Sequence, residues 1–326
     1  MKRILTLLLV LLQHACLAQV DPHFSQFYAH PLWLNPALTG AFDGTLRAAA
    51  IYRSQWANVS PYRTVGISAD LRTKRNINVG VSLLQQTAGD GGYQYQIGGV
   101  SVSYSGVRFG TDGAQQVFIG MQLGFLGRSF NPSDLRYGSQ WRPGTGFDPL
   151  AASGDNSVQQ TSSSFDASAG ITWMDTRSDA ALQPFAGMSV GHLMRPEDPF
   201  WGGMKFHLPL RYTVHGGLRY ALSDAARLQV QLLYLRQGTS EERMAGAGIN
   251  FFVKDHTELT AGASYRMGDA VSPYAGLRFG SITLGASYDH TISGLSKLAG
   301  NTNAFELSLS WVLAKEAGYD IPCPRF

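Results

Sequence analysis

The sequence predicts an all-β fold: a single antiparallel transmembrane β-barrel of about 14 strands, preceded by a cleaved signal peptide. Apolar and polar residues alternate with a period of two through many segments, and long and short connections alternate between them. Only 15% of the 326 residues are charged, whereas 11% are aromatic and 37 are glycine. This composition argues against disorder and against a coiled coil. The net charge of +3 gives no electrostatic reason to propose a nucleic-acid partner.

The N-terminal residues 1–18 have the parts of a secretory signal peptide. Positive charges at Lys2 and Arg3 precede an apolar core over residues 4–12, and small residues follow at the expected cleavage site. The apolar core is too short for a permanent transmembrane helix. A lipoprotein with Cys16 lipidated is the alternative, but Gln13 stands where an apolar residue would be expected.

The alternating segments have the length of membrane strands. In residues 211–222, for example, Tyr212 and Val214 fall on one face while Arg211 and Thr213 fall on the other. Soluble strands average about 5–6 residues, whereas tilted membrane strands need about 9–11. This length disfavours a soluble β-sandwich, the alternative fold. The predicted strands lie near 46–56, 62–72, 76–87, 94–107, 115–128, 163–175, 182–192, 210–222, 226–237, 241–254, 256–267, 272–280, 281–290 and 303–314.

The connections between the predicted strands sort by length. If both chain ends lie on one side, the connections on that side are all short, such as the basic turn at residues 73–75. The connections on the other side include the long segments 129–162, 193–209 and 291–302. Outer-membrane barrels have short periplasmic turns and long external loops. The sequence therefore predicts an outer-membrane location.

Aromatic residues cluster near the ends of the predicted strands. This position is typical of the aromatic girdles that mark the two membrane interfaces. The candidates are Tyr52, Trp56, Tyr62, Tyr93, Tyr95, Trp173, Tyr220, Tyr234, Tyr265 and Trp311.

The predicted barrel, residues 46–314, is flanked by two segments without alternation. Residues 19–45 contain three prolines and cannot form a ladder strand, yet they are too aromatic for a solvated linker. We expect them to pack inside the barrel or across its periplasmic mouth. Residues 315–326 form a predicted periplasmic tail that contains Cys323, Pro324 and Arg325. Cys323 is the only cysteine that remains after cleavage, which excludes an internal disulfide.

Charged residues on the polar strand faces are predicted to point into the barrel. Arg211 and Arg219 would each cost about 2–4 kcal/mol if they faced the bilayer centre. We expect both to pair with lumen carboxylates, for which Glu258, Asp289 and Glu306 are the candidates. An ion-paired, filled interior is favoured over an ion pathway.

No catalytic, cofactor-binding or metal-ligating residues are predicted. The histidines His215, His256 and His290 are scattered, and no Gly-x-Ser-x-Gly motif is present. The histidines and cysteines do not have metal-ligand spacing. A lipid-modifying enzyme is therefore the least favoured class.

One sequence block points to a family. Residues 21–40, DPHFSQFYAHPLWLNPALTG, resemble the opening signature of the PorP/SprF family of type IX secretion system outer-membrane proteins, found in Bacteroidota. Similar resemblances occur at residues 51–56, 131–135, 138–141, 192–197, 208–212, 215–217 and 323–326. The signature residues are Asp21, Pro22, Phe24, Ser25, Gln26, Phe27, Tyr28, Pro31, Asn35, Pro36 and Gly40.

This resemblance implies an outer-membrane barrel without enzymatic activity or cofactor. Its partners would be the membrane bilayer and either the periplasmic ring and lipoprotein subunits of the secretion system or one large secreted surface adhesin, as in gliding motility. The sequence does not separate these two roles. The alternative is an outer-membrane channel or transporter for small or hydrophobic molecules, which conductance in planar bilayers would distinguish.

Overall fold

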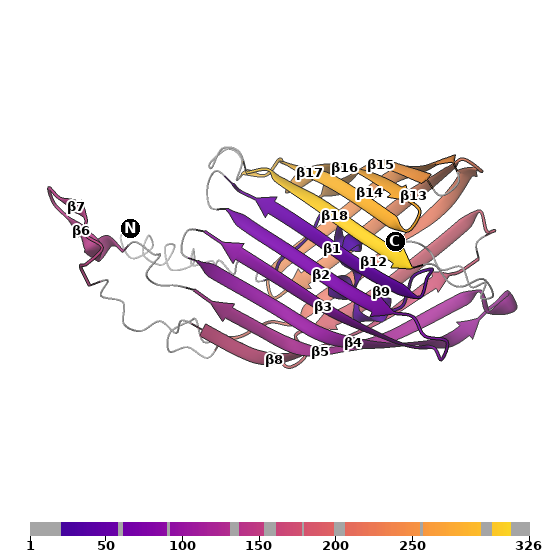
Figure 1. The fold of residues 1–326 in the computed structure, drawn as a ribbon, viewed down its shortest axis with the longest axis horizontal. Helices are drawn as coiled ribbons and strands as arrows, with labels where there is room; N and C mark the ends of the chain where they lie inside the picture. The colour runs from indigo at the N-terminus through magenta and orange to yellow at the C-terminus, as the bar shows by residue number, and fades with distance from the viewer. Residues whose placement is uncertain are drawn as a thin grey trace, which may run out of the picture.

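The computed structural model describes residues 21–57, 61–89, 92–130, 137–152, 161–177, 179–198, 206–254, 257–294 and 302–313. Its main body is a closed antiparallel barrel of 14 strands (Figure 1). The barrel strands are β1 (Leu46–Gln55), β2 (Tyr62–Leu71), β3 (Ile77–Ala88), β4 (Tyr93–Phe109), β5 (Gln115–Ser129), β8 (Thr161–Asp175), β9 (Leu182–Gly191), β12 (Arg211–Ser223), β13 (Ala226–Gln237), β14 (Ser240–Lys254), β15 (Thr257–Arg266), β16 (Ala270–Phe279), β17 (Ile282–Thr291) and β18 (Ala304–Leu313).

These strands correspond one to one with the segments predicted from alternation, and β1 closes the barrel by pairing with β18. The prediction of a 14-stranded barrel is confirmed. The expected cleaved leader, residues 1–18, and the expected tail, residues 315–326, lie outside the described residues. The described residues contain no helix that is long and apolar enough to cross a membrane.

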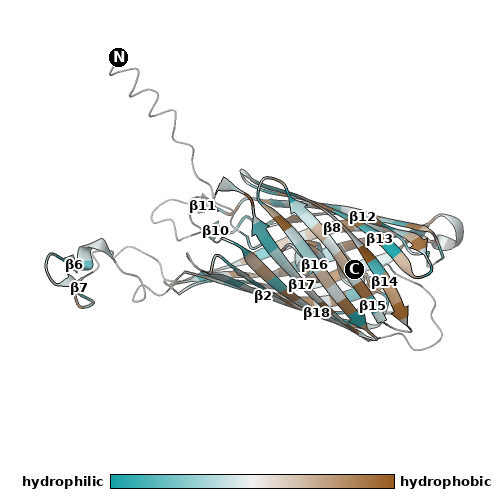
Figure 2. Ribbon diagram, turned by 90° about the horizontal axis from the view of Figure 1, so that it is seen from above, coloured by the Kyte–Doolittle hydropathy of each residue, from teal (hydrophilic) through white to brown (hydrophobic). Residues whose placement is uncertain are grey.

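The two ends of the barrel differ in their connections. Two small hairpins, β6 (Trp141–Arg142) with β7 (Gly146–Phe147) and β10 (Glu197–Asp198) with β11 (Phe206–His207), lie in connections predicted to be long. Figure 2 shows both hairpins at the same end of the barrel, which we call the loop end. The opposite end, which we call the turn end, carries short connections such as η3 (Thr111–Gly113).

The barrel is apolar outside because its strands alternate. On β5, Ile119, Met121 and Leu123 are 48–64% exposed on the outer face, while the intervening side chains point inward. A continuous apolar band of this kind is the lipid-facing surface of a membrane barrel. At least two predicted girdle residues are wrong. Tyr95 is 0% exposed and points into the lumen, and Tyr93, two residues earlier on β4, packs against the same interior cluster.

Residues 21–42, which we call the lumen segment, run through the inside of the barrel (Figure 1, indigo). Asp21 lies at the loop end, where its carboxylate accepts a hydrogen bond from Tyr95 near the start of β4. Phe42 lies at the turn end, where its carbonyl accepts a hydrogen bond from Arg72, directly after β2. Sequence analysis left the lumen and the periplasmic mouth open for this segment. The structure has it cross the lumen from end to end.

Two of the three prolines that exclude a strand, Pro31 and Pro36, start short helices in the lumen segment. Three helical turns follow one another: η1 (Phe27–Ala29), α2 (Pro31–Leu34) and η2 (Pro36–Leu38). Proline is favoured at the first helical position, because it has no N–H to leave unpaired there. The Asn35 side chain also caps η2 by accepting a hydrogen bond from the Ala37 N–H at 2.9 Å.

The hydrophobic core lies inside the barrel and is built around the lumen segment. Phe27, Leu34 and Leu38 pack against inward-facing side chains of five strands: Phe118, Met174, Phe185, Leu233 and Met244. A second cluster joins Phe24 to the barrel wall and to the end of the second long loop, through Ile51, Leu84, Tyr95, Leu126 and Leu208. The apolar side chains of the lumen segment thus cover the apolar side chains on the inner face of the barrel wall.

Two glycines in the wall make room for the lumen segment. A Cβ added at Gly120 on β5 would lie 2.4 Å from the backbone of Pro36 and Ala37. A Cβ at Gly170 on β8 would lie 2.0 Å from the Asn35 side-chain oxygen. Any larger residue at either position would force the lumen segment away from the wall.

Candidate functional site

The candidate site is the set of contacts that fix the lumen segment to the wall. Near the loop end, Glu306 on β18 accepts hydrogen bonds from the backbone N–H groups of Ser25 and Gln26, at 2.7 and 2.8 Å. The Ser25 hydroxyl donates to Asp289 on β17 at 2.8 Å. The Gln26 side-chain oxygen accepts from Ser308 at 2.8 Å. The backbone and side chains of the signature thus contact two neighbouring strands.

Two arginines balance these carboxylates. Arg53 on β1 pairs with Glu306 at 2.5 Å and with Asp289 at 2.9 Å, and Arg266 on β15 pairs with Asp289 at 2.7 Å. All four side chains are 1–4% exposed. We call Arg53, Arg266, Asp289 and Glu306 the arginine–acid cluster. Buried charges are tolerated when they are paired and hydrogen-bonded, as they are here.

A second anchor lies around Asp21, also at the loop end. One Asp21 oxygen accepts from the Tyr95 hydroxyl at 2.8 Å, and the other lies 2.7 Å from His192 Nε2. The other ring nitrogen of His192 lies 2.6 Å from Asp166 on β8. Arg211 lies 3.9 Å from Asp21 and stacks over the Trp33 ring. Asp21 therefore contacts two strands, β4 and β12, and also His192, the residue that follows β9, which in turn contacts β8.

Neighbouring charges determine the protonation states of His192 and Asp21 in this second anchor. Burial lowers the pKa of the His192 imidazole, but the adjacent Asp21 and Asp166 carboxylates outweigh it and raise the pKa to about 9. Burial would raise the pKa of Asp21, but His192 and Arg211 hold it well below its usual value. His192 is therefore a cation and Asp21 an anion at neutral pH, and the two form an ion pair.

Asn35 anchors the middle of the lumen segment. Its side-chain nitrogen lies 3.0–3.2 Å from the Ile171 carbonyl, the Thr172 hydroxyl and the Met188 carbonyl. His215 Nε2 lies 3.1 Å away. The Asn35 side chain is 0% exposed, and its contacts lie on β8, β9 and β12.

At the turn end the lumen segment is held by an ion pair. Arg47 on β1 pairs with Asp70 on β2 through two hydrogen bonds of 2.9 Å. Arg47 also donates to the Leu38 carbonyl at 3.0 Å, while the Gly40 N–H donates to Asp70 at 2.7 Å. This bidentate pair is fully desolvated, with Asp70 1% exposed.

The structure assigns the remaining signature residues to packing within the lumen. Pro22 accepts a hydrogen bond from the Trp33 indole at 3.2 Å, and Phe24 meets the edge of His30. The Phe27 and Tyr28 rings meet edge to face, and Tyr28 also contacts Tyr274 on β16. Pro31 and Pro36 start the helical turns.

The predicted lumen charges point inward, but the expected pairing of Arg211 with a carboxylate on a strand is wrong. Arg211 approaches Asp21 of the lumen segment rather than Asp289 or Glu306, because the segment supplies its own carboxylate. Arg219 is 8% exposed on the lumen side of β12. Glu258 lies 3.8 Å from Arg278 and accepts a hydrogen bond from Asn250.

Sequence reasoning missed Arg47, Arg53 and Arg266, which hold the lumen segment. A signal was present, because these arginines interrupt apolar strands on the polar face, as Arg211 does. The tail residues Cys323, Pro324 and Arg325, and also His256, lie outside the described residues. Among the described residues no group of three His, Cys, Asp or Glu side chains could hold a metal ion.

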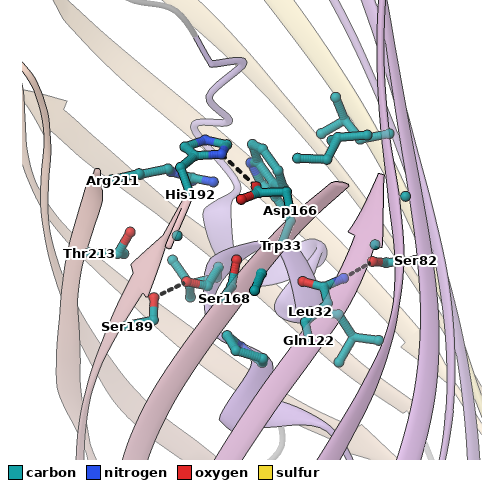
Figure 3. A pocket seen from close by; sticks show the side chains of 18 of the residues that line it. Leu32, Trp33, Ser82, Gln122, Asp166, Ser168, Ser189, His192, Arg211 and Thr213 are labelled. Carbon is teal, nitrogen blue, oxygen red and sulfur yellow. Dashed lines mark hydrogen bonds and ion pairs between the residues drawn. The ribbon is translucent and has the colours of Figure 1, made fainter. Parts of the chain in front are cut away.

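A small cavity lies between the lumen segment and the wall in the described part of the barrel. It has a volume of about 40 Å³, lies beside Trp33 and is bordered by Gln122, Asp166, His192 and Arg211 (Figure 3). This volume suits a few water molecules, since one water needs about 10–15 Å³ by this measure. The arrangement is that of a filled barrel whose chemistry is ion pairing and hydrogen bonding.

The comparisons with known proteins agree with this fold. The family model described as "Type IX secretion system membrane protein PorP/SprF" matches residues 16–311. The chain belongs to this family. The match includes the whole lumen segment and nearly all of the barrel, and it confirms the resemblance found in the sequence. A search of curated protein sequences found no match.

Solved structures with similar folds are membrane barrels. The toluene transporter TbuX of Ralstonia pickettii aligns with a TM-score of 0.51 at 9% identity, over 86% of this chain and 92% of TbuX. A mutant of the TodX monoaromatic hydrocarbon channel aligns with a TM-score of 0.53 at 10% identity, over 86% and 93% of the two chains. At this identity the likeness concerns the fold alone.

Proposed function

We propose that this PorP/SprF family member is an outer-membrane component of type IX secretion that works as a non-enzymatic platform. It would hold either the periplasmic subunits of the secretion system or a secreted surface adhesin. The observation that carries the proposal is the filled lumen: fourteen strands surround a buried, ion-paired segment. In a barrel filled in this way, the loops and the two ends of the barrel are the surfaces that can bind partners.

The loop end supports a binding role on the outside. The β6–β7 hairpin presents Trp141, which is 60% exposed, together with Arg142. Tryptophan and arginine are enriched among residues that dominate binding at protein interfaces. At the turn end, the basic turn with Lys74 and Arg75 is exposed and would face periplasmic partners.

A channel for small or hydrophobic molecules is the second candidate. The solved neighbours named above are a transporter and a channel, which favours it at the level of the fold. The lumen segment argues against it, because the 40 Å³ cavity beside Trp33 is too small for an aromatic hydrocarbon. Conductance in planar bilayers separates the two candidates.

The platform role can be tested by gentle detergent extraction of the tagged protein from native outer membranes, with mass spectrometry of what co-purifies. We expect either periplasmic ring and lipoprotein subunits or one very large surface protein. In the first case loss of the gene should block export of many proteins, and in the second it should release only one. A variant without residues 139–150 is the matched control for binding at the loop end. Absence of any specific partner would contradict the platform proposal.

A further inference from the structure

A groove on the outer surface is not used by the proposed function. It lies at the loop end of β12 and β13 and has a volume of about 560 Å³. Its lining combines apolar, aromatic and basic side chains: Arg195, Pro209, Leu210, Tyr212, Tyr234, Arg236 and Gly238.

The groove faces the membrane rather than the lumen. Tyr212 is 45% exposed, whereas Arg211 and Thr213 on either side are buried in the lumen at 6% and 2%. Tyr234 on β13 pairs in register with Val214, which is 49% exposed on the same outer face. Next along β13, Leu232 is 54% exposed and continues the lipid-facing surface. Tyrosines at the end of a lipid-facing column mark the membrane interface.

Two positive charges border this interfacial groove. Arg195 and Arg236 are both exposed. Arg236 uses its Nε–H to donate to the Gly238 carbonyl at 3.4 Å, and the guanidinium has four further N–H donors. The nearest acidic group on β14, Glu241, accepts from the Tyr234 hydroxyl at 3.2 Å and pairs with Arg243 at 2.5 Å. Glu241 stands opposite Arg236 in the β13–β14 register, but its carboxylate pairs with Arg243, and the two charged residues in the lining of the groove are both arginines.

We propose that this groove binds the phosphorylated headgroup of a lipid in the leaflet at the loop end. Guanidinium groups bind phosphate oxygens in pairs of parallel hydrogen bonds, which suits Arg195 and Arg236. The acyl chains would lie along Val214 and Leu232, below the tyrosines. A soluble anion would gain nothing from this apolar floor, whereas a lipid uses both parts of the site. The assignment of the leaflet rests on the proposed orientation, with the loop end outside.

Native mass spectrometry of the full-length barrel in detergent micelles tests this site, with bisphosphorylated lipid A as the probe. We expect the double variant Arg195→Ala/Arg236→Ala to bind it at least tenfold more weakly than wild type. The matched control is Lys74→Ala/Arg75→Ala, which removes the same charge at the turn end and should bind as wild type does. Arg195→Lys/Arg236→Lys keeps the positive charge but lacks the planar guanidinium that donates two parallel hydrogen bonds. It should bind lipid A with intermediate strength.

Equal lipid binding by all four proteins would overturn the proposal. Equally tight binding of dephosphorylated lipid A would also overturn it, because the arginines would then have no role. Displacement of the lipid by millimolar inorganic phosphate would indicate a free-phosphate site instead. If the double alanine variant does not refold, Arg236→Ala alone is compared with Arg75→Ala. None of these outcomes affects the platform proposal, which the co-purification from native membranes tests separately.

Discussion

Replacing Glu306 by alanine should destabilise the barrel by about 3–5 kcal/mol, the usual cost of removing one partner of a buried ion pair. Glu306 is 1% exposed and accepts hydrogen bonds from Arg53, Ser25 and Gln26. Its loss leaves the Arg53 guanidinium and two backbone N–H groups without this carboxylate inside the barrel. Urea unfolding of the refolded protein, followed by tryptophan fluorescence, measures the change in the free energy of unfolding.

Glu258→Ala is the matched control for this variant. Glu258 also lies on a barrel strand, but its side chain is 16% exposed and its arginine partner is 3.8 Å away. More exposed and looser pairs contribute about 0–1 kcal/mol. A Glu306 variant no less stable than the Glu258 variant would contradict the anchoring role of the arginine–acid cluster.

Deleting residues 22–38 should turn a barrel that does not conduct into one that carries a stable ohmic current. The deletion removes the three helical turns and the apolar side chains Phe24, Phe27 and Leu34 that fill the lumen. The arginine–acid cluster would remain on the wall and line a water-filled pore. Planar-bilayer recording of the purified proteins is the measurement.

Two further variants make the conductance result specific. A variant without residues 139–150 loses residues from the loop end instead of from the lumen and should not conduct. Gly120→Leu/Gly170→Leu keeps the lumen segment in the chain, but the two leucine side chains would occupy the space where it packs against the wall. This variant should conduct like the deletion. A deletion variant that refolds and remains silent would show that the lumen segment does not close the barrel.

The strands could be predicted from sequence because their signal is local. Each barrel strand alternates between lipid and lumen, so Ile119, Met121 and Leu123 reveal the lipid-facing side of β5 without any knowledge of their neighbours. The loop lengths then order the strands into hairpins, and an antiparallel barrel follows. Tyr95 was misplaced because an aromatic residue near a strand end fits both a girdle and a lumen contact.

The lumen anchors could not be predicted in the same way, because they join residues far apart in the chain. Ser25 meets Asp289 and Asn35 meets Thr172, pairs that no periodicity relates. Sequence reasoning paired Arg211 with carboxylates on strands, whereas its neighbour Asp21 comes from the lumen segment. The sequence shows only that glycine is abundant. That Gly120 and Gly170 must be glycine follows from the structure, in which Pro36 and Asn35 lie directly against them.

The most direct test of the central claim is a disulfide between the lumen segment and the wall. The hydroxyl oxygens of Thr39 and Ser101 on β4 are 2.8 Å apart, close enough for two thiols in their place to form a bond of about 2.0 Å. In a Cys323→Ser background, Thr39→Cys/Ser101→Cys should crosslink within one molecule, as detected by mass spectrometry of unreduced peptides. The control Thr39→Cys/Ser264→Cys uses a buried serine on β15, across the barrel from β4, and should not crosslink. Free thiols in the first variant, or equal crosslinking in both, would contradict a lumen filled by residues 21–42.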